Sequence, residues 1–420
     1  MSSSSLKGDA LYSGEEDTQI YCEETSLKGE ALHTIVAVML GWAFEAFDFM
    51  LFSMLAIPVM TTLNIDRIAF GLAISAGLIG TVIGGIGSGI LADKFGRVKV
   101  LMASLLIYGA ATIGIALSRT FYELLLFRFI VGLGLGAEWS TGMTLVAEIV
   151  PAEKRGFAVG LVQSGWPLGV LIAIADTILI YPIFGWRAAF AMASIPVLLV
   201  IYVRSKVPES TLWLQSKDKE KHRISLLYLF SRKLVSRTLI GLAIDVLAMF
   251  SYWMFWSWVP VFLAKERGFT VVRSAEWLII TQVGAWLGYI SYGYLQDKLG
   301  RRITWTIFTA AEATMILAYV LLIKDPLLML AAGLFLGFFT GFWSGFGAVL
   351  SELFPTKVRS TALGFIFNTG RGINFISPVL VAWLSLHLGW GAALSVAALS
   401  AYIASALIWL FPETKGIELK

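Results

Sequence analysis

The sequence predicts an all-α integral membrane protein with twelve transmembrane helices, arranged as two pseudo-symmetric six-helix bundles. Two observations support this fold class: the composition and an internal repeat. Hydrophobic residues make up 58 % and charged residues 14 % of the 420 residues, and the mean hydropathy is +0.79. A soluble domain carries about 25 % charged residues. Most of the side-chain surface is therefore expected to face the lipid bilayer.

The chain contains one unit twice, at a constant offset of 204 residues. The segment GILADKFGR, from Gly89 to Arg97, returns as GYLQDKLGR, from Gly293 to Arg301. Further pairs at this offset are Glu148 and Glu352, Arg155 and Arg359, Gly160 and Gly364, Gly185 and Gly389, and Pro208 and Pro412. An offset held over such a length predicts a tandem duplication whose copies agree element by element.

Twelve apolar segments follow one another along the chain, and a helix needs about 20 apolar residues to cross the bilayer core. In the first copy they lie near 33–60, 70–92, 99–118, 122–148, 157–181 and 187–203. In the second copy they lie near 237–263, 275–296, 303–323, 327–350, 360–384 and 390–411. The expected divisions are an N-terminal bundle at 33–203, a basic cytoplasmic linker at 204–236, a C-terminal bundle at 237–411 and a cytoplasmic tail at 412–420.

The first 32 residues are polar and acidic. The first 30 residues contain seven acidic residues and two lysines. The segment therefore lacks the basic start and the apolar core of a cleaved signal peptide. Residues 1–32 are therefore expected to form a disordered cytoplasmic tail. The single cysteine, Cys22, lies there, so no disulfide or cysteine-bound metal can form within one chain. We expect no metal and no cofactor.

Lysine and arginine are unevenly distributed between the two predicted sides of the membrane. The side with both termini collects 23 of them, and the loops on the opposite side hold seven. Because positive residues stay on the cytoplasmic side during insertion, both termini are expected in the cytoplasm. The expected location is the cell (plasma or inner) membrane.

Six plus six helices, a basic central linker and the motif that follows the second helix of each copy resemble the major facilitator superfamily. The resemblance covers about residues 33–413 and is specific, because the motif occurs at both positions that the family requires. It implies two halves related by an axis along the membrane normal, with substrate held between them near the midplane. It also implies that this site is exposed to the two sides of the membrane in turn.

A finer resemblance is to the sialate and carboxylate proton symporter branch. It rests on GWAFEAFDF at 41–49, on RFIVGLGLGAEW at 128–139 and on Gln163-Ser164-Gly165. Pro208-Glu209-Ser210 and Pro412-Glu413-Thr414 resemble sugar porter motifs instead. A carrier of sugar or another neutral metabolite, working as a symporter or a uniporter, is therefore the alternative.

The repeated motif is expected to act as a conformational latch. Asp93 and Arg97 lie four residues apart at the end of the second helix, where a carboxylate can meet a helix N-terminus and the arginine can neutralise it. In the family, this loop closes the cytoplasmic side of the outward-open state. Basic residues that only set the membrane topology are the alternative. The predicted latch residues are Gly89, Asp93, Arg97, Gly293, Asp297 and Arg301.

Glu45 and Asp48 lie one turn apart and deep in the first predicted helix. A carboxylate at that depth is costly unless it is paired, protonated or facing a wet cavity, so it is a functional candidate. Two acids on one face exchange one proton more easily than they carry two charges. We expect Glu45 and Asp48 to couple transport to protons, the alternative being a structural hydrogen bond.

Arg371 lies at a similar depth in the eleventh helix, with Asn368 and Asn374 three residues away on the same face. A guanidinium can hold a carboxylate through two parallel hydrogen bonds, and the amides could contact other polar groups of the ligand. A permanent salt bridge to Glu45, Asp48 or Asp245 is an equally weighted alternative. The predicted substrate-binding residues are Arg371, Asn368, Asn374, Gln163, Glu138 and Tyr252, the last at the repeat position of Asp48.

The motifs of common enzyme classes are missing from the sequence. It has three histidines, no His-Glu-x-x-His motif and no Gly-Lys dipeptide, so it has no phosphate-binding Walker loop. We therefore expect that the protein is not an enzyme and that it has no nucleic-acid partner. The expected function is secondary active transport of a small organic anion (a monocarboxylate, sialic acid or a related acid) by alternating access with proton symport, in a monomer. A receptor that does not transport is a further alternative.

Overall fold

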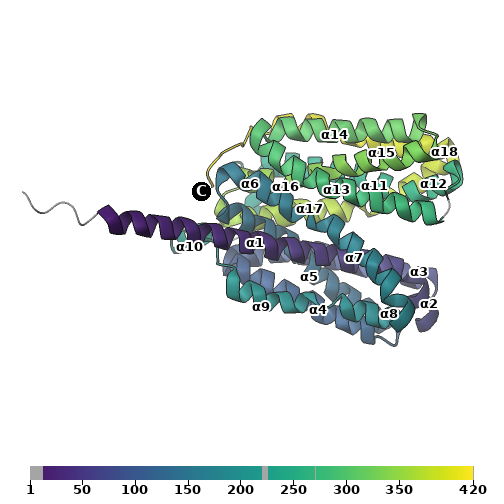
Figure 1. Cartoon of the computed structure of the whole chain (residues 1–420), viewed down its shortest axis with the longest axis horizontal. Helices are drawn as coiled ribbons and strands as arrows, with labels where there is room; N and C mark the ends of the chain where they lie inside the picture. Colours follow the sequence, from purple (N-terminus) through teal and green to yellow (C-terminus); the bar gives the residue numbers. More distant parts are fainter. Residues whose placement is uncertain (1–12, 220–225, 270, 420) are drawn as a thin grey trace, which may run out of the picture.

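The computed structural model describes residues 13–219, 226–269 and 271–419. Every regular element in these residues is a helix, and two bundles lie side by side along the long axis (Figure 1). The first consists of α1 (Ser13–Met54), α2 (Ala56–Leu63), α3 (Arg67–Phe95), α4 (Arg97–Leu117), α5 (Phe121–Ile149), η1 (Ala152–Lys154), α6 (Arg155–Gln163), α7 (Gly165–Leu179), α8 (Tyr181–Met192) and α9 (Pro196–Lys206).

A short helix, α10 (Thr211–Lys219), follows the first bundle. The second bundle consists of η2 (Leu226–Phe230), α11 (Val235–Trp256), α12 (Val259–Arg267), α13 (Val271–Leu299), α14 (Arg301–Leu317), the π-helical η3 (Ala318–Leu322), α15 (Pro326–Phe339), η4 (Thr340–Phe342), α16 (Trp343–Leu353), η5 (Thr356–Val358), α17 (Arg359–Ile373), η6 (Asn374–Ile376), α18 (Ser377–Leu407) and η7 (Ile408–Leu410).

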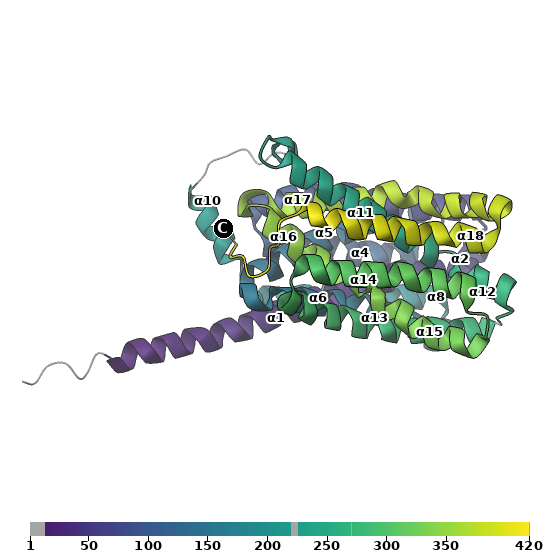
Figure 2. The ribbon, with the colours of Figure 1, turned by 90° about the horizontal axis from the view of Figure 1, so that it is seen from above.

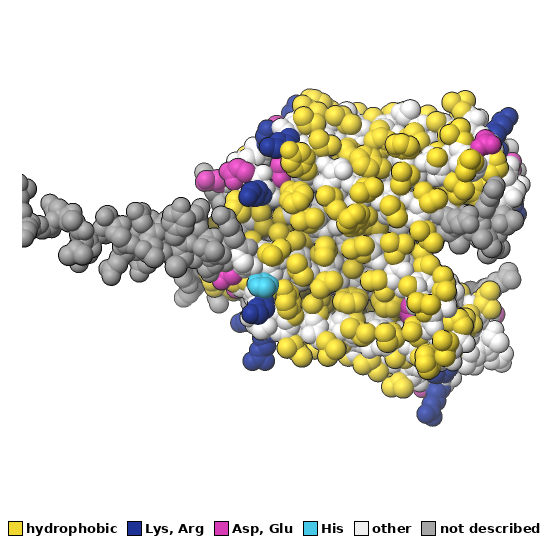
Figure 3. Space-filling model, in the orientation of Figure 1, with side chains coloured by type: hydrophobic (Ala, Val, Ile, Leu, Met, Phe, Trp, Pro, Cys, Tyr) yellow, Lys and Arg dark blue, Asp and Glu magenta, His cyan; other side chains and the backbone are white. Residues whose placement is uncertain are grey.

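Helices occupy all twelve predicted spans. Nine helical stretches within the described residues are long and apolar enough to cross a membrane. The other three places hold α5, α13 and α17. Of these, α5 contains Arg128, Glu138 and Glu148, and α17 has 15 residues. Apolar side chains cover most of the face seen in Figure 3, and most of the charged side chains on this face lie toward its two ends. The predicted fold class is confirmed.

Helix α1 differs from expectation in its length. It begins at Ser13, so part of the segment expected to be disordered is helical, and this part projects from the bundle (Figure 2). The sequence has no proline between residues 13 and 57, so nothing in it forces the helix to stop. The first 12 residues of the predicted tail lie outside the described residues.

Glycines allow close helix packing at equivalent places in the two halves. A methyl group on Gly84 of α3 would overlap the backbone of Leu133 in α5, and one on Gly288 of α13 would overlap the backbone of Phe338 in α15. Small residues of this kind let membrane helices approach closely. Gly288 follows Gly84 at the 204-residue offset, and the residues that they contact lie 205 apart, so the repeat extends to helix packing with a shift of one residue in the partner helix.

Two further equivalent glycines turn the chain between helices. Gly185 has φ 78° and ψ 172°, and Gly389 has φ 79° and ψ 163°. This region of backbone space is essentially restricted to glycine. Gly185 lies inside α8 and Gly389 inside α18, and each divides its element into two helical segments at a kink.

We expect Gly185→Ala and Gly389→Ala each to lower the free energy of unfolding by about 1–3 kcal/mol, because alanine is strained in this conformation. No heavy atom lies within 4 Å of an added Cβ at either position, so the loss is conformational. Thermal unfolding of the purified protein measures it. Gly87→Ala, in helix α3 with equally open surroundings, is the control and should not destabilise. Equal loss in all three variants would contradict this explanation.

Candidate functional site

A central cavity lies between the two bundles, and its empty space, part of it open to solvent, is about 400 Å³. Its walls come from both halves, and seven of the ten lining side chains are aromatic. They are Trp42, Gln163, Trp166, Met249, Tyr252, Trp253, Tyr289, Trp343, Phe367 and Arg371. Arg371 is the one charged side chain among these lining residues. Three of the six predicted substrate-binding residues, Gln163, Tyr252 and Arg371, therefore line the cavity.

An ion pair joins the two halves at this cavity. Arg371 Nη1 of α17 donates a hydrogen bond to Glu45 Oε1 of α1, at 2.9 Å. Both residues are buried, and the second carboxylate oxygen of Glu45 has no hydrogen-bond partner among the described residues. Arg371 thus forms the salt bridge to Glu45 that was the alternative to substrate binding, and it also lies at the wall of the cavity.

Asp48 faces a different partner, inside its own half. Its carboxylate accepts hydrogen bonds from Arg128 Nη1 of α5 and from the Thr112 hydroxyl of α4, each at 2.9 Å. The Arg128 guanidinium also stacks over the Phe52 ring, 4.0 Å from its centroid. Glu45 and Asp48 are one turn apart, but they belong to two separate ion pairs.

Gln163 links the halves through its amide. Its Oε1 accepts a hydrogen bond from Trp139 Nε1 at 3.0 Å, and its Nε2 donates to the Trp343 carbonyl at 3.1 Å. Trp139 stacks on Phe367, with ring centroids 3.7 Å apart. Tyr252 contributes its ring to the wall, 6.0 Å from that of Trp343. Both polar ends of Gln163 are therefore occupied within the protein.

The asparagines beside Arg371 are held by the protein and do not belong to the cavity lining. Asn368 donates to the Gly364 carbonyl at 3.0 Å, and its amide packs against Gly85 of α3. Asn374 donates to the carbonyls of Val246 and Gly370, at 3.1 and 2.8 Å. The predicted common face exists, but most of it contacts neighbouring helices.

Two buried carboxyl groups near the cavity lack hydrogen-bond partners among the described residues. Glu138 of α5 packs against Gly41 of α1, and Asp245 of α11 packs against Gly370 of α17. All four carboxyl oxygens are unpartnered. The sequence analysis predicted Glu138 as a substrate-binding residue because of its depth in the helix. It named Asp245 only as one possible salt-bridge partner of Arg371.

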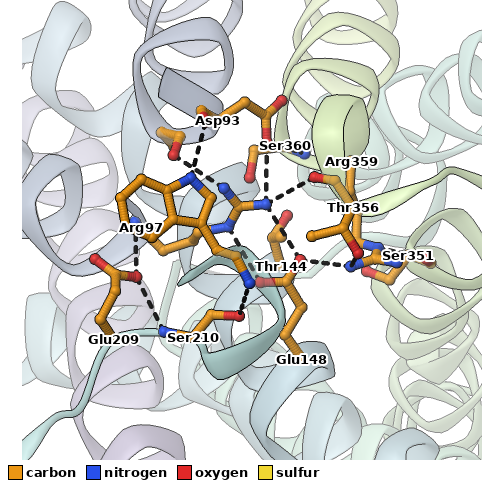
Figure 4. A network of polar contacts seen from close by, with 12 residues as sticks. Asp93, Arg97, Thr144, Glu148, Glu209, Ser210, Ser351, Thr356, Arg359 and Ser360 are labelled. Atoms are coloured by element: carbon orange, nitrogen blue, oxygen red, sulfur yellow. Dashed lines mark hydrogen bonds and ion pairs between the residues drawn. The ribbon is translucent and has the colours of Figure 1, made fainter. Parts of the chain in front are cut away.

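The first copy of the repeated motif fastens the N-terminal half to the C-terminal half (Figure 4). Asp93 accepts hydrogen bonds from the backbone N–H groups of Ser360 (3.3 Å) and Thr361 (2.8 Å) and from the Thr361 hydroxyl (2.6 Å). These donors lie in the first turn of α17, where a negative charge is favourable. Arg97 contacts Asp93 at 3.1 Å.

A buried carboxylate, Glu148, extends this contact. It pairs with Arg97 at 3.1 Å and also with Arg359 of the other half. Glu209, beyond α9, accepts the backbone N–H of Arg97 at 2.9 Å. Gly89 packs directly on the backbone of Ser360 and Thr361, so the helices meet without an intervening side chain.

The second copy makes the equivalent contact in the opposite direction. Asp297 accepts the N–H groups of Gly156 (3.0 Å) and Phe157 (2.7 Å), in the first turn of α6. Arg301 binds Asp297 at 2.6 Å and Glu352 at 2.8 Å. Gly293 packs against Gly160. Positions 156 and 157 become 360 and 361 at the 204-residue offset, so the two contacts are equivalent.

Glu352 and Glu413 complete the second contact as Glu148 and Glu209 complete the first. Arg155 pairs with Glu352 at 2.9 Å. Burial alone would raise the pKa of the Glu413 carboxyl, but backbone hydrogen bonds from Arg301, Arg302, Lys415 and Thr414 hold it below its ordinary value. The recurrence of these acids at the offset was the signal in the sequence, although it did not reveal their partners.

We call the end of the molecule with both contacts the latch end. Helix α10 and the C-terminal segment lie at this end (Figure 2), and the surface is hollowed between the halves at the opposite end (Figure 3). The latch end is therefore closed in this structure, and the contacts that close it come from both halves.

Known proteins share this sequence and architecture. The Major Facilitator Superfamily sequence model matches residues 38–291 and 246–419. The niacin transporter NiaP of Acinetobacter baylyi is 30 % identical over 426 residues, covering 93 % of this chain and 96 % of that protein. The cis,cis-muconate transport protein of the same species is 31 % identical, covering 88 % and 92 %. The sialic acid transporter NanX of Escherichia coli is 29 % identical, covering 86 % and 89 %.

The fold is that of a solved transporter. The proton:xylose symporter XylE, bound to 6-bromo-6-deoxy-D-glucose, superposes with a TM-score of 0.79 over 93 % of this chain and 98 % of that one. Its identity of 20 % makes this a likeness of fold alone. These relatives are transporters and not enzymes, as the sequence predicts. The chain belongs to the Major Facilitator Superfamily and is a membrane transporter of small organic metabolites.

Proposed function

We propose that the protein carries a small organic anion together with a proton, by alternating exposure of the central cavity to the two sides of the membrane. The observation that carries this proposal is the ion pair between Glu45 and Arg371, which joins the halves at the wall of the cavity. A fixed cation in a largely aromatic chamber attracts an anion, and a buried charge at this depth is costly without a partner.

Substrate and Glu45 would compete for Arg371. A substrate carboxylate that binds Arg371 displaces the Glu45 carboxylate, which would then remain as an unpaired charge inside the protein. Uptake of one proton by Glu45 removes that charge, so anion and proton bind more favourably together than apart. Of the two predicted coupling acids, Glu45 is the better placed, because Asp48 is already held by Arg128 and Thr112.

The lining supports a flat acid as substrate. Aromatic rings offer stacking surfaces, while Gln163 has both ends of its amide engaged and Asn368 and Asn374 are held elsewhere. Few free polar groups remain to bind the hydroxyls of a sugar. Niacin, muconate and sialic acid, the substrates in the names of the relatives, all carry carboxylates, and the lining favours the flat acids among them.

The latch end is proposed to face the cytoplasm, in the cell membrane. It collects the basic linker and both described chain ends, as the distribution of lysine and arginine requires. With Asp93 and Asp297 engaged, the structure corresponds to the state that is closed toward the cytoplasm. Residues 33–203 and 237–411 are proposed as the two moving bundles, working within a monomer.

Uptake of labelled nicotinate, benzoate, sialic acid and a hexose by proteoliposomes tests the proposal. We expect gradient-driven uptake of a carboxylate. Glu45→Gln should lower uptake driven by a pH gradient far more than exchange of internal for external substrate, because it removes the proton site across from Arg371 and leaves Arg371 itself. Gradient-driven uptake at the parental rate by Glu45→Gln, or a preference of the parent protein for the hexose, would contradict the proposed role of Glu45 in anion symport.

Arg371→Lys should weaken apparent substrate affinity about tenfold, since the ammonium group cannot form two parallel hydrogen bonds to a carboxylate. The concentration dependence of initial uptake rates measures the change. Arg119→Lys, at an exposed position outside the cavity, is the matched control. If both variants keep the affinity of the parent protein, Arg371 does not hold the substrate.

Asp93→Asn and Asp297→Asn should lower the maximal uptake rate about tenfold or more, with normal amounts of folded protein in the membrane. Each removes a charge-assisted contact to a helix N-terminus in the other half, worth about 1.5–3 kcal/mol. Uptake at matched expression measures the effect, and Asp66→Asn, an exposed helix cap at the other end, is the control. Unchanged rates would leave both aspartates with a role in topology only.

A further inference from the structure

We infer that Asp245 is a third member of the coupling site: it serves as the alternative counter-ion of Arg371 and holds a proton while Arg371 is paired with Glu45. This inference deepens the proposed proton-coupled transport and names a residue for the step that this mechanism leaves open, the return of the empty carrier. It starts from a carboxyl group that has no partner in the structure.

Asp245 is fully buried on α11, and neither carboxyl oxygen has a hydrogen-bond partner among the described residues. A charged carboxylate in such a place would be very costly. The side chain lies against Gly370, the residue before Arg371, and a methyl group at position 370 would overlap Asp245 Oδ2. The absence of a side chain on α17 is therefore what makes room for this carboxyl group.

Helices α11 and α17 are held together at this level. Asn374 of α17 donates a hydrogen bond to the carbonyl of Val246, the neighbour of Asp245. Arg371 directly follows Gly370, the residue against which the Asp245 carboxyl group packs. A guanidinium carries five N–H donors, and Arg371 uses Nη1 for Glu45, so further donors exist for a second acceptor.

Other charged side chains on α11 and on the helices packed against it are exposed or engaged elsewhere. Arg237 donates to the Leu353 carbonyl, and Arg359 belongs to the latch through Glu148. His387 of α18 hydrogen-bonds the Trp383 carbonyl and is exposed. Tyr402 of α18 hydrogen-bonds the Thr314 hydroxyl. Arg371 is thus the partner that the surroundings of Asp245 offer.

Glu45 and Asp245 have different roles because they lie in different halves of the protein. Glu45 lies in the N-terminal bundle and Arg371 in the C-terminal bundle, so their ion pair has to break when the bundles separate around the cavity. Asp245 and Arg371 lie in the same bundle and can remain together through the movement. An empty carrier that loses Glu45 as counter-ion therefore keeps a carboxylate for Arg371.

The exchange of partners conserves charge and protons. In the inferred paired state, Glu45 is ionised, Arg371 is positive and Asp245 carries a proton, so the three groups are neutral together. When Asp245 releases its proton and Glu45 takes one up, Arg371 changes its ion-pair partner from Glu45 to Asp245. The three groups together stay neutral. When a monocarboxylate binds Arg371, both acids are protonated, and the set remains neutral with one proton more. The inferred stoichiometry is therefore one proton per monocarboxylate.

Infrared spectroscopy of purified protein in lipid at neutral pH tests the assignment without substrate, because a protonated carboxyl group absorbs apart from a carboxylate. Glu45→Gln should lose the absorption of one protonated carboxyl group, although residue 45 is ionised in the parent protein, because Asp245 must then ionise to pair with Arg371. In the Asp245→Asn background, Glu45→Gln should cause no such loss. An unchanged band in Glu45→Gln would overturn the inference.

Two of the other buried carboxyl groups without hydrogen-bond partners among the described residues, Glu138 and Glu312, provide matched controls. In the Glu138→Gln and Glu312→Gln backgrounds, Glu45→Gln should still remove one protonated carboxyl group. If the loss disappears in either background, that residue and not Asp245 is the counter-ion, and the inference is wrong. If Asp245→Asn does not fold, the comparison of the parent protein with Glu45→Gln and with these two backgrounds decides the same question.

Transport of nicotinate separates this inference from the proposed function. Asp245→Asn should exchange internal for external nicotinate at the rate of the parent protein but lose net uptake, since the empty carrier cannot return. Parental net uptake in Asp245→Asn would overturn the inference and leave anion symport standing. A parent protein without proton-coupled uptake would refute the proposed function, while the infrared comparison would still decide the role of Asp245.

Discussion

The cost of an unpaired charge in the membrane interior is the constraint on which the rest of this structure depends. Arg128 and Arg371 lie buried within the bundles, and each is neutralised by a carboxylate of α1. The two pairs differ in one respect that determines their roles. The pair of Arg128 and Asp48 lies within one half, whereas that of Arg371 and Glu45 crosses the boundary between the halves, which separate there in the proposed transport cycle.

The same electrostatic reasoning applies at the latch end, where each half supplies a carboxylate to a helix N-terminus of the other. Duplication explains why there are two such contacts: a single unit that could bind a copy of itself gives both after fusion. The copies have since diverged, since Asp93 gains a third hydrogen bond from the Thr361 hydroxyl, whereas Phe157, at the equivalent position, has no hydroxyl to offer. The two contacts are thus equivalent in position but not in chemistry.

Most of the fold could be predicted from the sequence, because twelve apolar segments and a constant offset leave little freedom in the arrangement. The candidate site was predictable only in part. Helical spacing places Asn368 and Asn374 on the face of Arg371, but it does not say which neighbour covers that face. Asp245 has no acid at its repeat position, Gly41, so the repeat could not mark it. The extension of α1 was missed because polar composition does not prevent a helix without proline.

Helix α17 carries a latch contact in its first turn and Arg371 near its last, about 15 Å apart along its axis. Helix α6 repeats this arrangement, with Gly156 and Phe157 at the latch and Gln163 at the cavity. A short helix behaves as a rigid rod over such a length. In the proposed transport cycle, a tilt that brings one end toward a ligand therefore moves the other end, and occupancy of the cavity reaches the latch without any chain of intermediate side chains.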